Sequence, residues 1–348
     1  MRFPEFLKEN GKIGFIAPSF GCADEWHGKC FDEALKFFEE KGYTCVTGPN
    51  CREDSGIGKS NTPEKCAEEI NDFFMNDRSD VIISCGGGET MCENLPFVDF
   101  EGIAKAEPKW FMGYSDNTNL TYTLPVLCDT AAIYGPCVSQ FGKKPMHISA
   151  EDALLLLRGE KLSMESYPFW ERTEREYPAG IEPDPCDPMN DTEPSCMRAF
   201  LGSVPIEAAE FSGRLIGGCL DILSMLCGTE FDGSAAFAEK YKNDGIIWFL
   251  ESCDLNPMSI RRVLWQLENA GWFCHVKGFL IGRALHFDED MMGMNRLNAV
   301  TGLLGKYDVP VIMDVDLGHL PPMMPLISGA MADVKYENNK LSIDMRLE

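Results

Sequence analysis

The sequence has few histidines, no long hydrophobic run and no paired cysteine motif. No apolar stretch approaches the length that crosses a bilayer, so no transmembrane segment is expected. The fifteen cysteines are an odd number and are scattered, without a C-x-x-C pair or zinc-ligand spacing. We therefore expect no disulfide framework and no metal site, and we interpret the cysteines as small, reduced, buried residues. The amino terminus lacks a basic segment followed by an apolar core, which predicts a cytoplasmic protein without a signal peptide.

Positive charge is also scarce. The chain has 31 Lys and Arg residues against 55 Asp and Glu residues, a formal net charge of -24. Nucleic acids and anionic membranes are bound by Lys and Arg side chains, so this balance argues against both as partners. The 45% hydrophobic and 25% charged residues are typical of a soluble globular protein, and 348 residues suffice for two domains.

The most informative stretch covers residues 109–119. Its apolar part, 110–112, predicts a buried strand that ends at Gly113 and is followed by a helix start. Ser115 would then lie at a strand-to-helix turn beside free backbone N–H groups, as an acyl-transfer nucleophile requires. The pattern departs from G-x-S-x-G because Asn117 occupies the last glycine position. A plain turn or capping serine therefore remains an alternative.

Strands and helices alternate along the first 130 residues, which predicts a doubly wound parallel sheet of the Rossmann-like kind. The expected strands are 12–18, 43–47, 81–83 and 110–112, and the expected helices are 28–41 and 63–74. Beyond Gly213 we expect a helix over 217–227, strands at 245–250, 276–281 and 311–315, and a helix over 259–270.

The composition divides the chain into three parts. We predict an N-terminal domain over 1–160, a linker or excursion over 161–205, and a C-terminal domain over 206–348. Within the middle part, residues 167–194 are crowded with proline, acidic and polar residues. The sequence leaves open whether this segment covers an active site as a lid.

A serine nucleophile needs a base, and only five histidines are available. His319 is our first candidate, because it follows a predicted strand in a turn freed by Gly318 and stiffened by prolines. His286 also follows a strand and is the second candidate. A histidine that is merely hydrogen-bonded in a loop is the alternative for either.

A carboxylate and two backbone donors would complete such a site. Glu251 closes the apolar run 246–250, where an unpaired charge would be costly, so a histidine or an arginine should lie beside it. The backbone N–H groups of Asp116 and of Gly87 or Gly88 could hold an oxyanion. An ordinary glycine turn explains the glycines equally well.

Five motifs, taken together, resemble the LD-carboxypeptidase family, in particular its branch of microcin C self-immunity proteins. They are Ser84-Cys85-Gly86-Gly87-Gly88, Gly113-Tyr114-Ser115-Asp116-Asn117-Thr118, Gly213-Arg214-Leu215-Ile216-Gly217-Gly218, Phe249-Leu250-Glu251 and Asp316-Leu317-Gly318-His319-Leu320-Pro321-Pro322. The resemblance covers nearly the whole chain, with the motifs in the family's order. It departs from the family at Cys219, Asn117 and Ser252, which leaves the exact substrate open.

The resemblance implies a serine carboxypeptidase with Ser115 as nucleophile, His319 as base and Glu251 as its carboxylate partner. It also implies a Rossmann-like N-terminal domain, a smaller β-rich α/β C-terminal domain and an active site at their junction. The implied substrate is a murein peptide or a microcin-like peptidyl or aminoacyl nucleotide. The implied protein is a homodimer without metal or other cofactor.

Two other functions stay open from the residues alone. A cysteine-dependent hydrolase would use Cys85 or Cys253, each of which lies near a proposed site element, although a buried structural cysteine is the commoner case. A protein that binds a small molecule in a cleft between the domains, without chemistry, is the other alternative.

Overall fold

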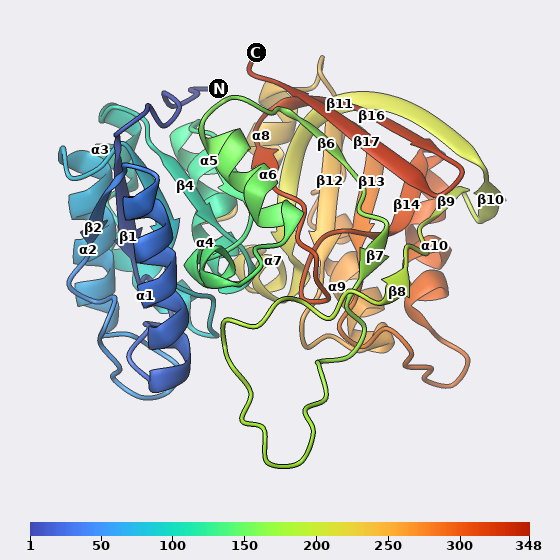
Figure 1. Cartoon of the computed structure of the whole chain (residues 1–348). Coiled ribbons are helices and arrows are strands. Elements are labelled where there is room, and N and C mark those ends of the chain that lie inside the picture. Colours follow the sequence, from blue (N-terminus) through green and yellow to red (C-terminus); the bar gives the residue numbers. More distant parts are fainter.

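The computed structural model describes all 348 residues, which form two large β-sheets side by side with helices around them (Figure 1). The first sheet has the order β15-β5-β4-β3-β1-β2, and only β15 runs antiparallel to its neighbour. Its parallel strands are β1 (Lys12–Ile16), β2 (Thr44–Thr47), β3 (Val81–Ser84), β4 (Trp110–Gly113) and β5 (Ala132–Tyr134). Their order is that of a doubly wound, flavodoxin-like sheet, so the predicted Rossmann-like fold is confirmed.

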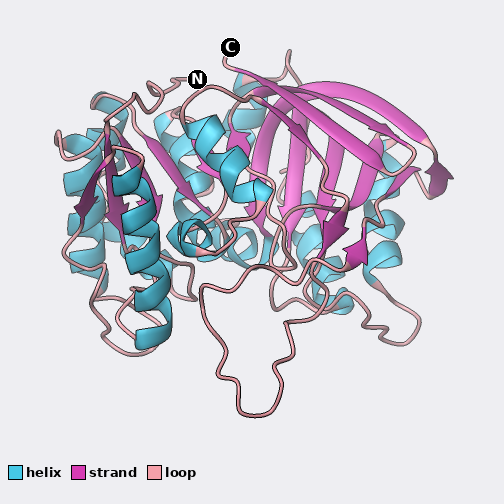
Figure 2. Cartoon of the chain, in the orientation of Figure 1, coloured by secondary structure: helices cyan, strands magenta, loops and turns pink.

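Helices cover the first sheet (Figure 2). They are α1 (Glu25–Glu40), α2 (Pro63–Met75), α3 (Phe100–Lys105), α4 (Thr118–Thr121), α5 (Thr123–Cys128) and α6 (Ile148–Leu157). Asp24 caps the start of α1, where its side chain accepts from the His27 N–H. The helix packs Phe31 and Phe38 against Phe15 of β1, with ring centroids 5.7 Å apart in each pair. None of the helices in the fold combines the length and apolar composition of a membrane-spanning segment.

The second sheet has nine strands in the order β10-β9-β14-β13-β12-β11-β16-β17-β6. Its centre is parallel and consists of β11 (Ala208–Cys219), β12 (Ile246–Glu251), β13 (Val276–Gly282) and β14 (Pro310–Val315). Antiparallel strands flank this centre: β9 (Arg198–Leu201), β10 (Val204–Ile206), β16 (Met331–Glu337), β17 (Lys340–Arg346) and β6 (Ser163–Glu165). The accompanying helices are α7 (Leu220–Leu226), α8 (Ser234–Lys240), α9 (Pro257–Asn269) and α10 (Arg296–Leu304).

The two sheets exchange strands. The C-terminal β15 (Leu326–Ser328) pairs with β5 in the first sheet, and β6 from the middle segment pairs with β17 in the second. The segment 161–205, expected as a linker or excursion, thus supplies β6 and β9 to the second sheet, and it also forms the short pair β7 (Phe169–Trp170) and β8 (Glu193–Pro194). The largest apolar cluster contains residues of both sheets, so the sheets share one continuous core.

The helix expected over 217–227 begins later than predicted. Gly217 and Gly218 continue β11 beside Phe249 and Leu250 of β12, and the helix α7 starts only at Leu220. A β-carbon on Gly217 would lie 1.7 Å from the Phe249 carbonyl oxygen, and one on Gly218 would lie 2.5 Å from Thr118 Cγ2. The glycines therefore permit close packing of a strand end rather than opening a helix.

The fifteen cysteines are all free, and nine of them are buried. Two clusters bring several sulfur atoms together. Cys22, Cys51 and Cys85 lie next to one another in the largest apolar cluster, and Cys30 Sγ lies 3.8 Å from Cys186 Sγ.

Candidate active site

Ser115 lies at a sharp turn directly after β4. Its φ of +63° is in the left-handed region, which a residue with a side chain rarely adopts. A 3-10 turn over Ser115–Asn117 leads into α4. This geometry matches the predicted strand-to-helix turn, and it presents the serine hydroxyl at the end of the sheet.

Asp116 and Asn117 hold this turn in place. The buried Asp116 carboxylate accepts from Ser19 Oγ at 2.5 Å and from the Met91 N–H at 3.0 Å. The Asn117 side-chain amide donates to the Gly86 carbonyl at 2.8 Å. The asparagine that interrupts the G-x-S-x-G pattern therefore ties the serine turn to the glycine loop after β3.

The glycine loop itself approaches the serine. A β-carbon on Gly87 would lie 3.0 Å from Ser115 Cβ and 3.1 Å from Ser115 Oγ, so a side chain there would crowd the hydroxyl. A β-carbon on Gly88 would instead meet Ser19 Oγ at 2.2 Å. Gly87 is thus the residue of the loop that adjoins Ser115, whereas Gly88 adjoins Ser19.

An unbroken chain of hydrogen bonds joins Ser115, His319 and Glu251. Ser115 Oγ lies 2.8 Å from His319 Nε2, and His319 Nδ1 lies 2.9 Å from Glu251 Oε2. Because an ionised carboxylate can only accept, Nδ1 carries the proton and Nε2 of the neutral ring is free to accept from the serine hydroxyl. The serine follows β4 of the first sheet, whereas the glutamate ends β12 and the histidine follows β14 of the second. The structure therefore brings the three predicted residues together where the two sheets meet.

The Glu251 carboxylate is completely enclosed. Burial alone would raise its pKa, but the His319 imidazole and the side chains of Tyr134 and Cys219 together hold the pKa of Glu251 below its ordinary value. In return the carboxylate raises the pKa of His319, against the effect of its burial, and the neighbouring Cys253 thiol adds to this rise. The pair thus favours a positive charge on the imidazole next to Ser115.

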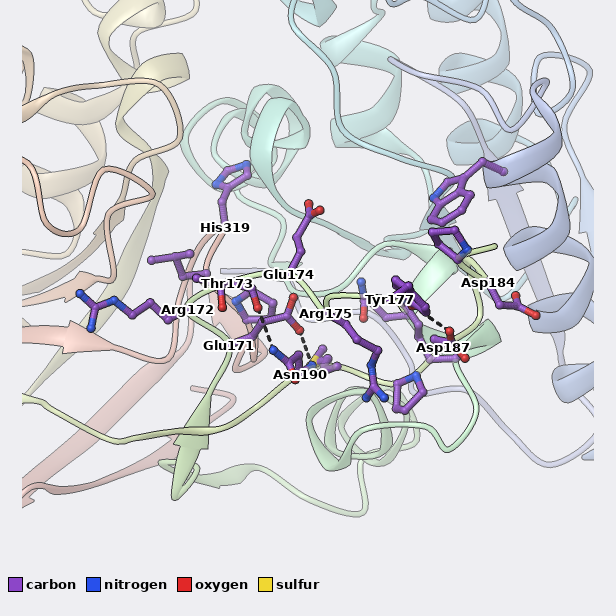
Figure 3. A pocket seen from close by; sticks show the side chains of 18 of the residues that line it. Glu171, Arg172, Thr173, Glu174, Arg175, Tyr177, Asp184, Asp187, Asn190 and His319 are labelled. Atoms are coloured by element: carbon purple, nitrogen blue, oxygen red, sulfur yellow. Dashed lines mark hydrogen bonds between the residues drawn. The ribbon is translucent and has the colours of Figure 1, made fainter. Parts of the chain in front are cut away.

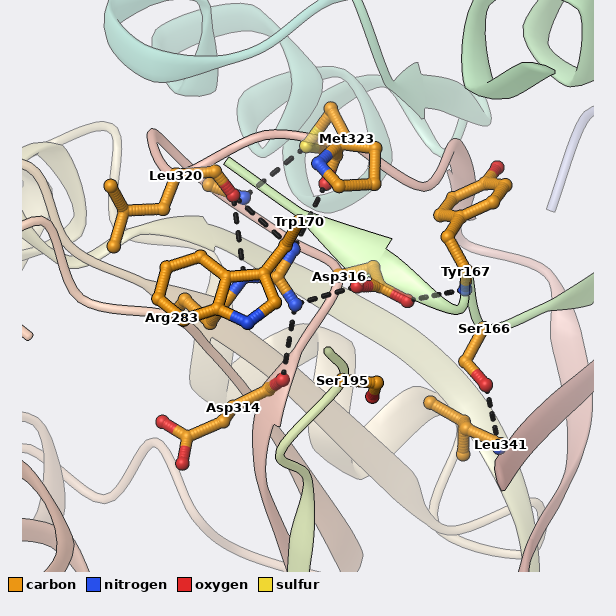
Figure 4. Close-up of polar contacts among 12 residues, drawn as sticks. Ser166, Tyr167, Trp170, Ser195, Arg283, Asp314, Asp316, Leu320, Met323 and Leu341 are labelled. Atoms are coloured by element: carbon orange, nitrogen blue, oxygen red, sulfur yellow. Dashed lines mark hydrogen bonds and ion pairs between the residues drawn. The ribbon is translucent and has the colours of Figure 1, made fainter. Parts of the chain in front are cut away.

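A buried arginine fixes the turn that carries His319 (Figure 4). The Arg283 guanidinium, with no exposed surface, donates to Asp316 Oδ1 at 2.6 Å and to the Leu320 carbonyl at 3.3 Å. The other Asp316 oxygen accepts from the Tyr167 N–H at 2.8 Å. Gly318 in this turn has a φ of +99°, and a β-carbon there would lie 2.6 Å from Glu251 Oε2. Both ends of the turn are therefore anchored, and its glycine allows the histidine to reach the glutamate.

A cavity of about 540 Å³ opens beside His319 (Figure 3). Much of its wall comes from the loop between β7 and β8, and Trp26 of α1 also lines it. The loop is attached to α1, since Lys29 pairs with Asp184 at 2.7 Å and Cys30 Sγ donates to the Pro185 carbonyl at 2.9 Å. The proline- and acid-rich segment thus forms one wall of the space next to the candidate site.

The other candidates are not members of this hydrogen-bonded chain. His286, the second choice for the base, is half-exposed and lies 3.3 Å from Glu289 Oε2. Cys85 is buried among other cysteines, and burial raises the pKa of its thiol well above the ordinary value, which disfavours the reactive thiolate. Cys253 lies near His319, but both ring nitrogens of that histidine already face Ser115 and Glu251.

Four residues around the site were not predicted from the sequence: Tyr134, Cys219, Arg283 and Asp316. The motif Asp316-Leu317-Gly318-His319 contained one of them, without a role. Cys219 was noted only as a departure from the family pattern. The sequence offered no signal for the other two, because a tyrosine at the end of an apolar strand and an arginine that follows one look like core or edge residues. No group of three or more His, Cys, Asp or Glu side chains is arranged to hold a metal ion.

Family models and known proteins match this chain over most of its length. The model of the LD-carboxypeptidase N-terminal domain matches residues 13–135, and that of the LD-carboxypeptidase C-terminal domain matches residues 212–334. The microcin C7 self-immunity protein MccF of Escherichia coli is 27% identical over 334 residues, which are 95% of this chain and 92% of that protein. A protein of Bacillus subtilis named as a probable murein peptide carboxypeptidase is 26% identical and covers 80% of this chain and 73% of its own length.

Solved structures share the fold. MccF in complex with aspartyl sulfamoyl adenosine superposes with a TM-score of 0.80 at 22% identity, covering 99% of both chains. An MccF-like protein from Bacillus anthracis also gives a TM-score of 0.80, at 20% identity, and covers 99% of this chain and 100% of its own. The two-sheet architecture is therefore common to these proteins.

The buried ion pair under the His319 turn yields a stability prediction. Arg283→Met leaves the Asp316 carboxylate buried without its cation, so we expect the free energy of unfolding to fall by about 3–5 kcal/mol in urea titration. As a control, Arg172→Met removes an ion pair to Asp288 that is exposed to solvent, and its unfolding midpoint should stay close to that of the wild type. Equal midpoints for the two variants would contradict the anchoring role of Arg283.

Proposed function

The chain belongs to the LD-carboxypeptidase family, and from this premise we propose that it is a serine carboxypeptidase with Ser115, His319 and Glu251 as catalytic residues. The observation that carries the proposal is the hydrogen-bonded chain from the serine hydroxyl through the imidazole to a buried carboxylate. An alkyl hydroxyl is a poor nucleophile, and this arrangement is the one that makes it reactive.

In the proposed reaction, Ser115 Oγ attacks the carbonyl carbon that precedes the last residue of the substrate. His319 Nε2 accepts the hydroxyl proton and later donates it to the departing amine, and water then releases the acyl group by the same steps. Glu251 keeps Nδ1 protonated and stabilises the imidazolium that forms. The raised pKa of His319 supports this role, because it reflects a site that favours the charged ring.

The proposed oxyanion hole consists of backbone donors on either side of the serine. The N–H of Asp116, which follows the nucleophile in sequence, is one donor, and the glycine loop supplies the other. Gly87 fits better than Gly88, because Gly87 adjoins the Ser115 hydroxyl. Each such donor contributes roughly 3 kcal/mol to transition-state stabilisation.

The substrate that we propose is a small peptide or an aminoacyl nucleotide, cleaved at a terminal amide bond. The cavity of about 540 Å³ beside His319 has the size of a small-molecule site. Support for the two classes comes from the relatives: one is named for murein peptides, and another is solved with aspartyl sulfamoyl adenosine. We further propose a homodimer that needs no metal or cofactor, as the family resemblance implies, and a cytoplasmic location, as the sequence pattern of the amino terminus predicts.

The nucleophile is tested by Ser115→Ala. We expect hydrolysis to fall about 10⁶-fold while the far-UV spectrum and unfolding midpoint stay unchanged. Ser212→Ala, which removes an exposed hydroxyl bonded to Asp333, is the matched control and should retain full activity. Labelling of the wild type by a fluorophosphonate at Ser115, without inactivation by iodoacetamide, excludes the cysteine mechanism. Hydrolysis by purified Ser115→Ala would refute the assignment.

The substrate class is tested by offering a murein tetrapeptide and an aminoacyl sulfamoyl adenosine in separate incubations. Mass spectrometry should show loss of the terminal residue from the first or release of the amino acid from the second. We expect at least one of them to be cleaved by the wild type and neither by Ser115→Ala. Binding of either compound without any cleavage would favour a non-catalytic cleft protein instead.

The pH dependence follows from the coupling of Glu251 and His319. Activity requires the neutral imidazole, and the carboxylate raises the pKa of His319, so the acidic limb of kcat/KM should lie above pH 6.5. Glu251→Gln removes the negative charge, and we expect that limb to move to lower pH while the plateau falls roughly 10³- to 10⁴-fold. The rate of fluorophosphonate labelling against pH measures both effects. A limb that stays in place would show that Glu251 does not set the pKa of His319.

A further inference from the structure

One buried phenol touches both halves of the site described above. Tyr134 ends β5 in the first sheet and has no exposed surface. Its hydroxyl donates to Glu251 Oε1 at 2.5 Å, and its oxygen accepts from the Ser115 N–H at 3.3 Å. The carboxylate oxygen that it holds is the one that His319 does not use.

The surrounding strands leave the phenol little freedom. Tyr134 pairs with Gly113 of β4 on one side and with Leu326 of β15 on the other. Its ring packs on Phe249 of β12 at a centroid distance of 5.4 Å, two residues before Glu251. The tyrosine is therefore built into the first sheet while its hydroxyl reaches into the second.

We propose that Tyr134 is a positioning residue that sets the Glu251 carboxylate and the Ser115 backbone relative to each other across the junction of the sheets. The inference rests on the proposed serine mechanism. With the Tyr134 and His319 donors on different oxygens, the carboxylate cannot rotate without losing a hydrogen bond. A charge-assisted hydrogen bond of this kind is roughly twice as strong as one between neutral groups.

The contact with Ser115 has a second consequence. Serine hydrolases use either the N–H of the nucleophile itself or that of the following residue in the oxyanion hole. Here the Ser115 N–H points to the phenol oxygen of Tyr134, so it is directed to the interior rather than to the substrate. The phenol also gives the left-handed Ser115 backbone a fixed partner. The backbone N–H groups of Asp116 and Gly87 then remain as the donors to the oxyanion.

The hydrogen bond to Glu251 also affects proton uptake by the Glu251–His319 pair. A donor stabilises the proton-free pair, with net charge -1, more than the neutral ion pair in which His319 is protonated. Removing the phenol hydroxyl therefore makes proton uptake by the pair more favourable. A residue that only filled space would leave this equilibrium unchanged.

The test is Tyr134→Phe, which removes one oxygen and keeps the ring. We expect fluorophosphonate labelling of Ser115 and substrate hydrolysis to slow about 10- to 100-fold. We also expect the acidic limb of labelling to move to higher pH by roughly 0.5–1 unit, opposite in direction to Glu251→Gln. Tyr241→Phe is the matched control, because that phenol also donates to a carboxylate, Asp129 at 2.6 Å, but away from the site. Its labelling rate and pH limb should match the wild type.

A double-mutant cycle with Glu251→Gln separates positioning from loss of fold. If Tyr134 acts through the carboxylate, adding Tyr134→Phe to Glu251→Gln should slow labelling much less than it does in the wild type. Equal slowing in both backgrounds, or a slower rate with an unmoved pH limb, overturns the positioning role. Wild-type protein that is not labelled at all would instead refute the proposed serine mechanism, so the two failures are distinguishable.

Discussion

A single buried charge, the carboxylate of Glu251, constrains the centre of this molecule. It ends a strand whose residues are all buried, in a place where an ionised group is costly unless it is paired and hydrogen-bonded. The imidazole of His319 and the phenol of Tyr134 each bind one oxygen of the carboxylate, and both come from segments remote in sequence. The same contacts that make the charge tolerable also align the imidazole with Ser115. The contacts that stabilise the buried charge are therefore the same contacts that the proposed chemistry needs.

The exchange of strands between the two sheets holds these contacts together. The strand β15 follows His319 by only a few residues and pairs with β5 in the first sheet, which also carries Ser115. This pairing attaches the His319 segment to the sheet of the serine. The Arg283 guanidinium anchors the turn that carries His319. The two sheets are thus joined next to the site. This connection keeps Ser115 Oγ and His319 Nε2, which lie 2.8 Å apart, in fixed relative positions.

The parts that were predictable from the sequence are those with a strong local signal. Runs such as Val81–Ile83 are continuously apolar because both faces of the strand are covered, and Glu251 and His319 stood out as polar residues at strand ends. The long strand β11 was misinterpreted at its end, because its glycines leave no side-chain pattern and only contacts with Phe249 and Thr118 explain them. The strand β16 alternates buried and exposed residues, a signal that was present in the sequence but was not used.

The roles of Tyr134 and Arg283 could not be predicted from the sequence. A tyrosine in an apolar strand is an ordinary core residue, and its importance comes only from the carboxylate that another sheet places beside it. The same holds for Arg283, whose partners are carbonyl groups and a carboxylate of a turn more than thirty residues away. Local pattern cannot encode such pairings, because they depend on the arrangement of distant strands.

The proposed catalytic residues lie at strand ends, whereas a loop lines much of the cavity, and this separation bears on substrate specificity. The residues of the serine–histidine–glutamate chain are fixed by the sheets, whereas much of the cavity wall comes from the loop between β7 and β8. That loop contacts α1 through Asp184 and Pro185, whereas its residues 172–176 and 178–183 are exposed, so this exposed part can change without disturbing the buried carboxylate. Relatives named for murein peptides and for microcin are similar to this chain in sequence. A cavity wall that can change beside reactive groups held by the sheets is a physical route to such a difference in substrate. Specificity in this chain should accordingly be determined by the loop, and reactivity by the strand ends that hold the proposed catalytic residues.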